Sequence, residues 1–412
     1  MAIETLPVWP FEPNWSGVLT EALEWLTDVL TSPSGAEQRR CLRLYPRKTI
    51  EFSTALGGNE RAVFDQFLST HGGRNMYLPQ WHESYRSGAA VAAGAVSIPC
   101  DQANNGGLRI GDIIFISAND PRHYELAEVL SLSASAITLV APLVSAWPAF
   151  SKVHPVRKAR LDDQPTLRRV TDSGVTFTTT FRIMQRNDDV NIVLGPSVTT
   201  DLLPIYQGFN VLPTVPDERD SIDVGITRMI DVLDNEVGIP IYNDVAGIPF
   251  KSQKYNWALQ GRADYDTLKK TFYHLRGRAI PAWLPTFFND LQIVENTPTG
   301  GTSIKIENIG FTASGGVQTG RTHIMVTRVD GTNTFHRILS SAIDGDKEII
   351  GVNSPFASGL PAASVMRISF MQLSRLDQDR IEIVHHTDTR GVSACTARFR
   401  AAPDLRQVQP GF

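Results

Sequence analysis

One pattern occurs in two distant parts of the chain, and it limits the possible folds more than any other feature. Residues 72–81 read GGRNMYLPQW, and residues 276–285 read RGRAIPAWLP. Each combines a Gly-Arg step, an aromatic residue and a Leu-Pro step after a short amphipathic run that predicts a helix. Glycine readily ends a helix in the left-handed conformation, and the residue before a proline favours an extended conformation. The pattern therefore predicts a helix followed by a strand, twice.

The segments around this pattern also correspond. Residues 25–40 match residues 229–244, since both contain Asp-Val-Leu and then a turn-prone stretch with Gly35 or Gly238. Both copies continue with an alternating strand that ends at Ala-Leu and with a helix. The apolar residues at helical spacing are Val63, Phe64, Phe67 and Leu68 in one copy, and Tyr265, Leu268, Phe272 and Leu275 in the other. Short alternating strands follow in 108–162 and in 317–377, separated by turn-forming residues such as Asp-Gly.

These matches predict a mainly β protein that arose by tandem duplication. We expect each copy to be a β-sandwich unit with one helix and an inserted small β-barrel-like domain. The predicted boundaries are 1–86 plus 159–190 for the first unit, 87–158 for its insert, 203–292 plus 373–402 for the second unit, 293–372 for its insert, and 403–412 for a C-terminal tail.

Bulk composition excludes several classes of protein. The chain has 412 residues, 42% of them hydrophobic, and a net charge of −4, so it lacks the basic excess of a dedicated nucleic-acid binder. We expect no membrane insertion, because no apolar run is long enough. The acidic, Pro-rich N-terminus predicts no signal peptide. The cysteines, Cys41, Cys100 and Cys395, are odd in number and far apart, which favours free thiols and a reducing compartment during folding.

Histidine-containing motifs do not predict an active site. His71 lies in STHGGRN, which is similar to an esterase oxyanion loop, but the Gly-x-Ser-x-Gly elbow that completes such a site is absent from the sequence. We interpret His71 as a polar residue in the last turn of a helix. His385, His386 and Asp388 could supply metal ligands. Adjacent histidines on a strand point to opposite faces, however, so we do not predict a metal site there.

Acidic and glycine-rich stretches are interpreted as loops. The pairs Asp162–Asp163 and Asp188–Asp189 lie in turn-rich segments, which does not indicate the facing carboxylates of a glycosidase. The glycine-rich residues 104–107 and 297–303 precede predicted strands instead of helices, so they do not form a phosphate cradle. We therefore predict no catalytic, cofactor-binding or metal-binding residue, and no enzyme.

Two basic clusters, residues 37–48 and 154–169, leave two interpretations open. If 37–48 is a strand, its alternate residues fall on different faces: Arg40, Leu42 and Leu44 on one, and Arg39, Cys41, Arg43 and Tyr45 on the other. Such arginines could line a channel that passes nucleic acid by electrostatics alone. The favoured interpretation is a solvated or interface face, where arginine is also enriched.

Residues of the first copy resemble a known family. They are Thr27-Asp28-Val29, Gly35-x-Glu37-Gln38-Arg39, Tyr45-Pro46-Arg47, and Leu78, Pro79 and Trp81. At these positions the chain resembles the distal tail proteins of long-tailed bacteriophages and phage-like particles. The resemblance covers the first 85 residues best. It implies a tube-like β-sandwich with one helix and an extra β-domain, placed between tail tube and tip. It implies no catalytic residues. The second copy lacks the Glu-Gln-Arg and Pro-Arg steps, so if these residues make a ring contact, the two copies cannot make it identically.

The predicted function is structural. Two unlike units per chain would let three chains imitate six-fold order, so we expect a trimeric ring with pseudo-six-fold symmetry, with a hexamer as the second choice. The expected partners are the tail tube protein, the tape-measure protein and the tip hub and fibre proteins, without sequence-specific binding of nucleic acid. The expected location is the distal tail of the virion, after folding in the host cytoplasm. The alternatives are a glycan-binding or receptor-binding module, for which Trp147, Phe150 and Phe356 are the candidate aromatics, and a cell-wall-degrading tail enzyme.

Overall fold

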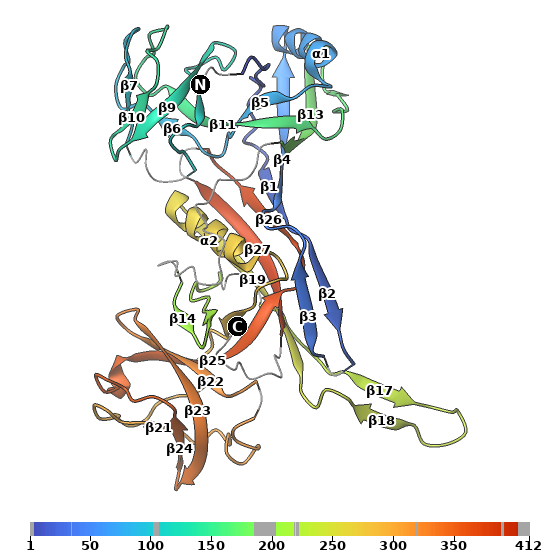
Figure 1. Ribbon diagram of the computed structural model, residues 1–412, viewed down its shortest axis with the longest axis vertical. Helices are drawn as coiled ribbons and strands as arrows, with labels where there is room; N and C mark the ends of the chain where they lie inside the picture. Colours follow the sequence, from blue (N-terminus) through green and yellow to red (C-terminus); the bar gives the residue numbers. More distant parts are fainter. Residues whose placement is uncertain are drawn as a thin grey trace.

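The computed structural model describes residues 4–33, 35–101, 107–184, 203–217, 219, 222–318, 320–388 and 391–402. It is mainly β, as predicted, with antiparallel strand ladders and two α-helices, α1 (Asn59–His71) and α2 (Arg262–Leu275), among these residues. The molecule is elongated, with a β-rich lobe at each end and a sheet between them (Figure 1). No helix in the described part of the chain is both long enough and apolar enough to cross a membrane.

The central sheet runs continuously through both halves of the sequence. Its order is β13, β4, β1, β26, β27, β19, β16, each strand antiparallel to the next. The N-terminal half (residues 4–184) joins the C-terminal half (residues 203–402) where β1 pairs with β26, with Leu19 opposite His385 and Glu24 opposite Arg380. The strands are β1 (Leu19–Glu24), β4 (Arg47–Gly57), β13 (Gly174–Ile183), β16 (Val224–Thr227), β19 (Phe250–Gln260), β26 (Arg380–His385) and β27 (Val392–Ala401).

Both halves order their strands in the same way around their helix. In the N-terminal half, β4 leads into α1, and β5 (Met76–Pro79) then pairs with β11 (Lys152–Leu161). In the C-terminal half, β19 leads into α2, and β20 (Ala282–Pro285) pairs with β25 (Val365–Leu376). Residues at strand ends also correspond: Ala159 lies opposite Ile183, and Ser374 lies opposite Ala401.

The helices lie where apolar spacing predicted them, but two details of the prediction were wrong. Phe64 lies on the buried face of α1, whereas Val63 lies on the solvent-facing side of the same helix and is 46% exposed. Gly72, at the end of α1, has a right-handed φ of −57°, since its N–H continues the helical pattern by donating to the carbonyl of Leu68. Only α2 ends in the left-handed conformation, at Arg276 and Gly277.

Each end lobe has its own apolar core. One lobe contains β6 (Tyr85–Arg86), β7 (Ser97–Pro99), β8 (Ile113–Ser117), β9 (Tyr124–Leu132), β10 (Ala136–Leu139) and the start of β11. The other contains β21 (Ser303–Glu307), β22 (His323–Arg328), β23 (Asn333–Asp344), β24 (Lys347–Val352), the short helix η1 (Ala362–Ser364) and the start of β25. Outside them, β12 (Arg168–Arg169) borders β13, and β14 (Ile205–Tyr206) pairs with β15 (Phe209–Asn210). The exact domain boundaries stay a prediction.

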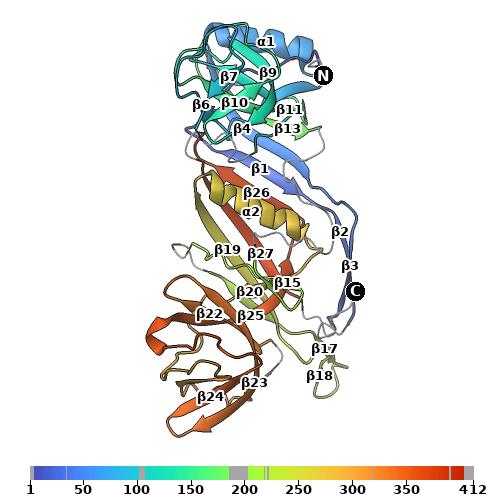
Figure 2. The ribbon, with the colours of Figure 1, turned by 60° about the vertical axis from the view of Figure 1, so that its left-hand side comes forward.

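Two β-hairpins extend from the central sheet. The first hairpin consists of β2 (Thr27–Thr31) and β3 (Glu37–Cys41), and the second of β17 (Ile230–Leu233) and β18 (Ile241–Asp244). They occupy the segments that the sequence matched to each other. Both hairpins lie on the right-hand side of the two views, the first beside the central sheet and the second below it, where it extends away from the molecule in Figure 1 (Figures 1 and 2).

Candidate functional site

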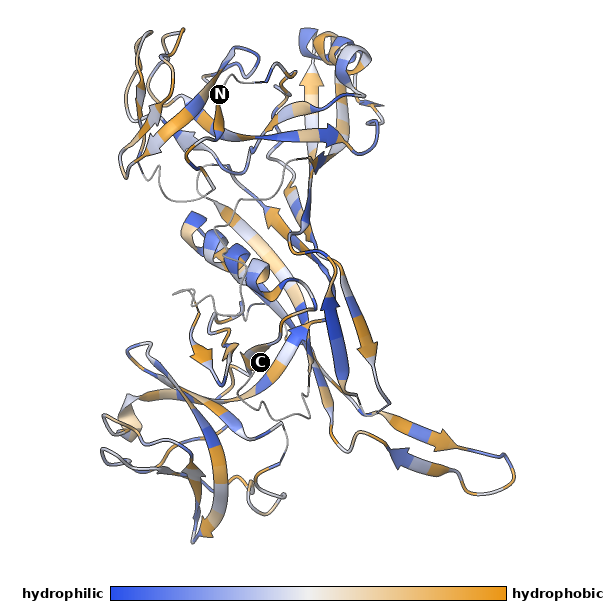
Figure 3. Cartoon of the chain, viewed as in Figure 1, coloured by the Kyte–Doolittle hydropathy of each residue, from blue (hydrophilic) through white to orange (hydrophobic). Residues whose placement is uncertain are grey.

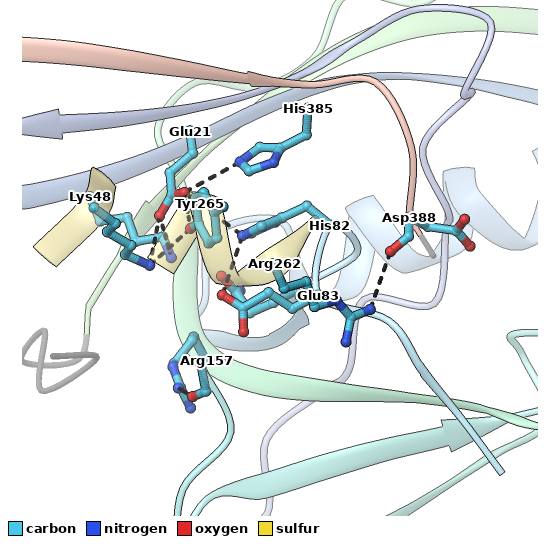
Figure 4. Close-up of polar contacts among 12 residues, drawn as sticks. Glu21, Lys48, His82, Glu83, Arg157, Arg262, Tyr265, His385 and Asp388 are labelled. Atoms are coloured by element: carbon cyan, nitrogen blue, oxygen red, sulfur yellow. Dashed lines mark hydrogen bonds and ion pairs between the residues drawn. The ribbon is translucent and has the colours of Figure 1, made fainter. Parts of the chain in front are cut away.

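Buried charged groups converge where the two halves meet (Figure 4). Glu21 on β1 lies at the centre, and its side chain is 0% exposed. Its Oε1 atom lies 2.7 Å from the Nζ of Lys48 on β4 and 3.3 Å from the Nζ of Lys269 on α2. One carboxylate from the N-terminal half is therefore shared between an ammonium group of each half.

The second oxygen of Glu21 faces neutral donors. Its Oε2 atom accepts a hydrogen bond from the Tyr265 hydroxyl and lies 3.4 Å from the Nε2 of His385. The Nε2 of His82 lies 3.9 Å from the same oxygen, and the rings of His82 and His385 stack with centroids 4.4 Å apart. Glu83 extends the cluster, with its Oε1 atom 3.6 Å from the Nε2 of His82.

Burial and charge act in opposite directions on the two carboxyl groups. Burial alone would raise the pKa of Glu21, but Lys269 and Lys48 outweigh it and hold that pKa well below its usual range. Burial opposes ionisation of Glu83 as well, and His82 and Lys269 outweigh it, so the pKa of Glu83 falls to about 2. Both carboxyl groups are therefore ionised at neutral pH.

His385 and Tyr265 favour their neutral forms. Burial lowers the pKa of His385 to about 4, with a further contribution from His82. Burial and the charge of Glu21 raise the pKa of Tyr265. Glu21 and Glu83 thus face the two ammonium groups of Lys48 and Lys269 while His385 stays neutral. The arrangement fits an ion-pair lock between the halves.

Three of these residues have the atoms of a metal-binding set. One ligand atom from each of Glu21, His82 and His385 lies within 4.8 Å of the others. Lys48 and Lys269 lie close to the same carboxylate, however, so a divalent cation would add two positive charges beside two buried ammonium groups. The cost of burying uncompensated charge argues against a metal centre.

The structure separates the two histidines that the sequence singled out. His385 is buried in the cluster, whereas His386 is exposed, so adjacent histidines do point to opposite faces. Asp388 is not in this cluster, and its carboxylate lies 3.8 Å from the guanidinium of Arg86. Sequence reasoning missed Glu21 and His82. The available signal was Glu21 itself, since it shares the inward face of β1 with Leu19 and Leu23.

The other candidate motifs have structural roles or lie outside the described residues. His71 is in the last turn of α1, as predicted, with its ring centroid 5.1 Å from that of Phe67. Asp162 forms an ion pair with Arg182 at 2.9 Å. Asp188, Asp189 and residues 104–106 fall outside the described part of the chain. Residues 297–303 lead into β21, as predicted for a loop before a strand.

The aromatic residues proposed for glycan binding do not form an exposed platform together. Trp147 is 3% exposed, and its indole N–H donates to Glu125 at 3.1 Å, so it is a core residue. Phe356 is 2% exposed, and only Phe150, at 68%, faces solvent. Stacking against a sugar needs an accessible ring face, which two of the three lack.

The basic clusters divide between internal pairs and exposed residues. From Glu37 to Tyr45 exposure alternates, as a strand predicts, and Arg40, Leu42 and Leu44 share the more exposed face. In the second cluster Arg157 is buried and lies 2.9 Å from Asp112, whereas Arg160, Arg168 and Arg169 are exposed. The arginines of the two clusters therefore do not form one continuous basic surface.

The first hairpin docks onto the C-terminal half of the same chain. Glu37 on β3 forms a two-pronged ion pair with Arg375 on β25, with both N–O distances 2.7 Å and side chains 7% and 4% exposed. At its base, Asp379 accepts hydrogen bonds from the N–H and hydroxyl of Thr27, at 2.8 and 2.9 Å. Asp379 also accepts one from the N–H of Arg278, in the Gly-Arg step after α2. The repeated motif thus contributes to a hairpin dock.

Replacing Gly35 with alanine should loosen this dock. Gly35 has a φ of +82°, and a Cβ there would fall 2.1 Å from the Cζ of Phe250 on β19. We expect a loss of about 1–3 kcal/mol in the free energy of unfolding, from overpacking and backbone strain. Gly238→Ala, in the second hairpin, is the matched control, since nothing lies within 4 Å of its added Cβ. Urea denaturation would measure both, and equal stability of the two variants would contradict the dock.

The second hairpin has apolar residues with no such cover. Figure 3 shows hydrophobic residues along it. They include Ile230, Leu233, Val237, Ile239, Ile241 and Tyr242, which are 50–94% exposed. An exposed apolar arm of this kind is typical of a protein–protein interaction site.

Comparison with known proteins finds no family model that matches the chain, and no curated protein matches it in sequence.

Proposed function

We propose that the chain is a structural subunit of a phage tail, which forms a ring at the distal end of the tube and joins the tube to the tip hub and fibres. The two halves would be diverged copies of one tube-like β-sandwich unit, each with an inserted small β-barrel-like domain. Three chains would form a pseudo-six-fold ring, with a hexamer as the second choice. The tape-measure protein would pass through the lumen.

The observation that carries this proposal is the junction of the central sheet. The N-terminal half is joined to the C-terminal half by an antiparallel pair of edge strands, β1 with β26. Among the described residues, the corresponding strands at the outer ends have one neighbour each: β16 pairs with β19, and β12 pairs with β13. Unpaired edges promote pairing with another chain, and ring closure removes them.

Ladder register supports the correspondence between these edges. In β1, Glu24 lies opposite Arg47 of β4, and in β16, Thr227 lies opposite Phe250 of β19. Repeating the β1–β26 pairing between two chains would place β16 of one copy against the outer edge of β12 and the residues just before it in the next. A head-to-tail contact of this kind forms a closed ring if the rotation per unit is a simple fraction of a turn.

The native mass of the purified protein tests the proposal. Light scattering after size-exclusion chromatography should give three times the chain mass of 45.4 kDa at high protein concentration. A mass of six chains would support the hexamer instead. A chain that stays monomeric at high concentration and does not join isolated tail tubes would contradict a ring-forming subunit.

Charges placed on the two free edges should abolish assembly. We expect Ile226→Asp, on β16, and Leu167→Asp, beside β12, to leave monomers, because each would bury a carboxylate at the new strand pair. Both side chains are exposed in the single chain, at 63% and 38%, so the fold itself should persist. Val144→Asp is the control, since Val144 is 84% exposed on an end lobe. Circular dichroism would verify folding, and light scattering would measure mass.

A further inference from the structure

The dock of the first hairpin has a counterpart in the N-terminal half. Arg375 lies opposite Arg400 in the β25–β27 ladder, and Arg160 lies opposite Arg182 at the same register of the β11–β13 ladder. Arg375 is buried by its ion pair with Glu37, whereas Arg160 is exposed. The same position is thus covered in one half and open to solvent in the other.

The turn after each helix has the same relation to the dock. In the C-terminal half, Asp379 accepts a hydrogen bond from Arg278 after α2. In the N-terminal half, Gln164 occupies the corresponding position, and its side-chain amide donates to the carbonyl of Gly72 after α1, at 3.0 Å. In each half, the residue after the β-ladder (Asp379 or Gln164) therefore lies against the turn that follows the helix.

In the N-terminal half these residues surround a surface pocket. Its volume is about 480 Å³, and its lining includes Gly72, Gly73, Arg160, Asp162, Gln164 and Arg182. We call it the Arg160 pocket. Arg160 and Gln164 hold the positions that Arg375 and Asp379 hold in the dock of the first hairpin. The pocket therefore has the location of an empty hairpin dock.

The second hairpin has the geometry to fill such a dock. Leu30 lies opposite Gln38 in the first hairpin, and Leu233 lies opposite Ile241 in the second. This register places Pro240 at the position of Glu37, and Gly238 at that of Gly35. The loops between the matched pairs have equal lengths, so the tips correspond as well.

The charges of the two surfaces also bear on this fit. Residues 230–244 contain four carboxylates, Asp231, Asp234, Glu236 and Asp244, and no lysine or arginine, and Asp244 pairs with Arg228. The pocket lining contains Arg160, Arg182, Asp162 and Asp163, and Arg182 pairs with Asp162 at 2.9 Å. Arg160 is exposed, so an acidic side chain of the hairpin can pair with it.

We propose that the Arg160 pocket receives the second hairpin of another copy of this chain. The same chain cannot supply it, because α1 and β13 lie at the opposite end of the molecule from β17 and β18 (Figure 1). The contact would have the same placement between chains that the first hairpin has within one chain, with Pro240 in the place of Glu37 and without its ion pair. The proposed contact identifies which surfaces of two chains would meet in the ring. It rests on the proposed function only in the assumption that successive contacts close into a ring.

Site-specific cross-linking tests the contact directly. Arg160→Cys and Pro240→Cys are made separately, each with Cys41→Ser to remove the one native thiol that is not fully buried. The two variants are mixed and treated with a short bismaleimide, because a contact with the spacing of a Glu–Arg pair holds the Cα atoms too far apart for a direct disulfide. We expect covalent dimers in the mixture and none in either variant alone. Val144→Cys mixed with Pro240→Cys is the matched control.

A charge exchange gives an independent measurement. Arg160→Glu should weaken self-association by about tenfold or more, as expected for reversal of one member of a charge pair at an interface. Asp234→Arg, introduced into the same chain, should restore most of the loss, whereas Asp234→Arg in the otherwise native chain should also weaken association. Sedimentation at low salt would measure the three association constants.

The outcomes separate this contact from the ring. Covalent dimers together with a closed ring mass support both. Covalent dimers with an open series of larger masses support the hairpin contact and contradict the ring. A ring mass without cross-linking above the control overturns the hairpin contact and keeps the ring. Monomers without cross-linking contradict both.

Discussion

Glu21→Gln should lower the free energy of unfolding by about 3–5 kcal/mol, the cost of removing one member of a buried ion-pair network. Glutamine preserves the shape of the side chain, so the loss reports charge and not volume. Lys48 and Lys269 would lose the carboxylate that lies 2.7 and 3.3 Å from their ammonium groups. Since these lysines belong to different halves, the loss should appear as weaker coupling between the halves, measured by urea denaturation.

The same strand provides a matched control. Glu24 on β1 lies 4.0 Å from Arg43, and its side chain is 45% exposed. An exposed pair contributes about 0–1 kcal/mol, so Glu24→Gln should change stability little. If both variants lose the same stability, the buried cluster is not an ion-pair lock. A double variant, Glu21→Leu with Lys48→Met, should be more stable than Glu21→Gln, because it removes one buried negative charge and one buried positive charge together.

Much of the fold was predictable because local periodicity encodes it. The alternating residues of β4 and the helical spacing in α2 place Phe52 and Phe272 in the core, as expected. Strand alternation also predicted that Arg40, Leu42 and Leu44 share one face, which the structure shows to be the exposed one. Val63 shows the limit of such patterns, because one apolar residue at the margin of a helical stripe can fall on either side.

The junction was not predictable, because its members come from separate elements. Glu21, His82, Tyr265 and His385 lie on three elements and one loop, and no spacing within the chain relates them. The two hairpins also show that sequence patterns do not predict tertiary contacts. Sequence matched them as equivalent segments, yet the first packs against Phe250 and Arg375 while the second is exposed. A pattern identifies a hairpin, but the surface that receives it depends on tertiary contacts.

This difference between two like hairpins suits the proposed assembling subunit. In that proposal the filled dock fixes the geometry within the chain, and the Arg160 pocket would repeat it between chains. The second hairpin has Pro240 at the position that Glu37 holds in the Glu-Gln-Arg motif of the first.

Acidification should weaken the junction before most carboxyl groups titrate. Burial lowers the pKa of His385 from 6.5 to about 4, so the unfolded chain binds more protons between these pH values and the free energy of unfolding falls as the pH decreases. The full contribution is about 3 kcal/mol. The effects of Glu21 and Glu83, whose pKa values are lowered, appear as the pH falls below the ordinary carboxyl range. The window from about pH 6.5 to 4.5 therefore reports the histidines.

His385→Gln should flatten the dependence of stability on pH within this window. Loss of one titrating group removes up to about 1.4 kcal/mol per pH unit from the slope. Part of the slope should persist, because burial also lowers the pKa of His154 to about 3 and that of His323 to about 4. Urea denaturation at several pH values would measure the slopes, and an unaltered slope in His385→Gln would mean that this imidazole is not held neutral by burial.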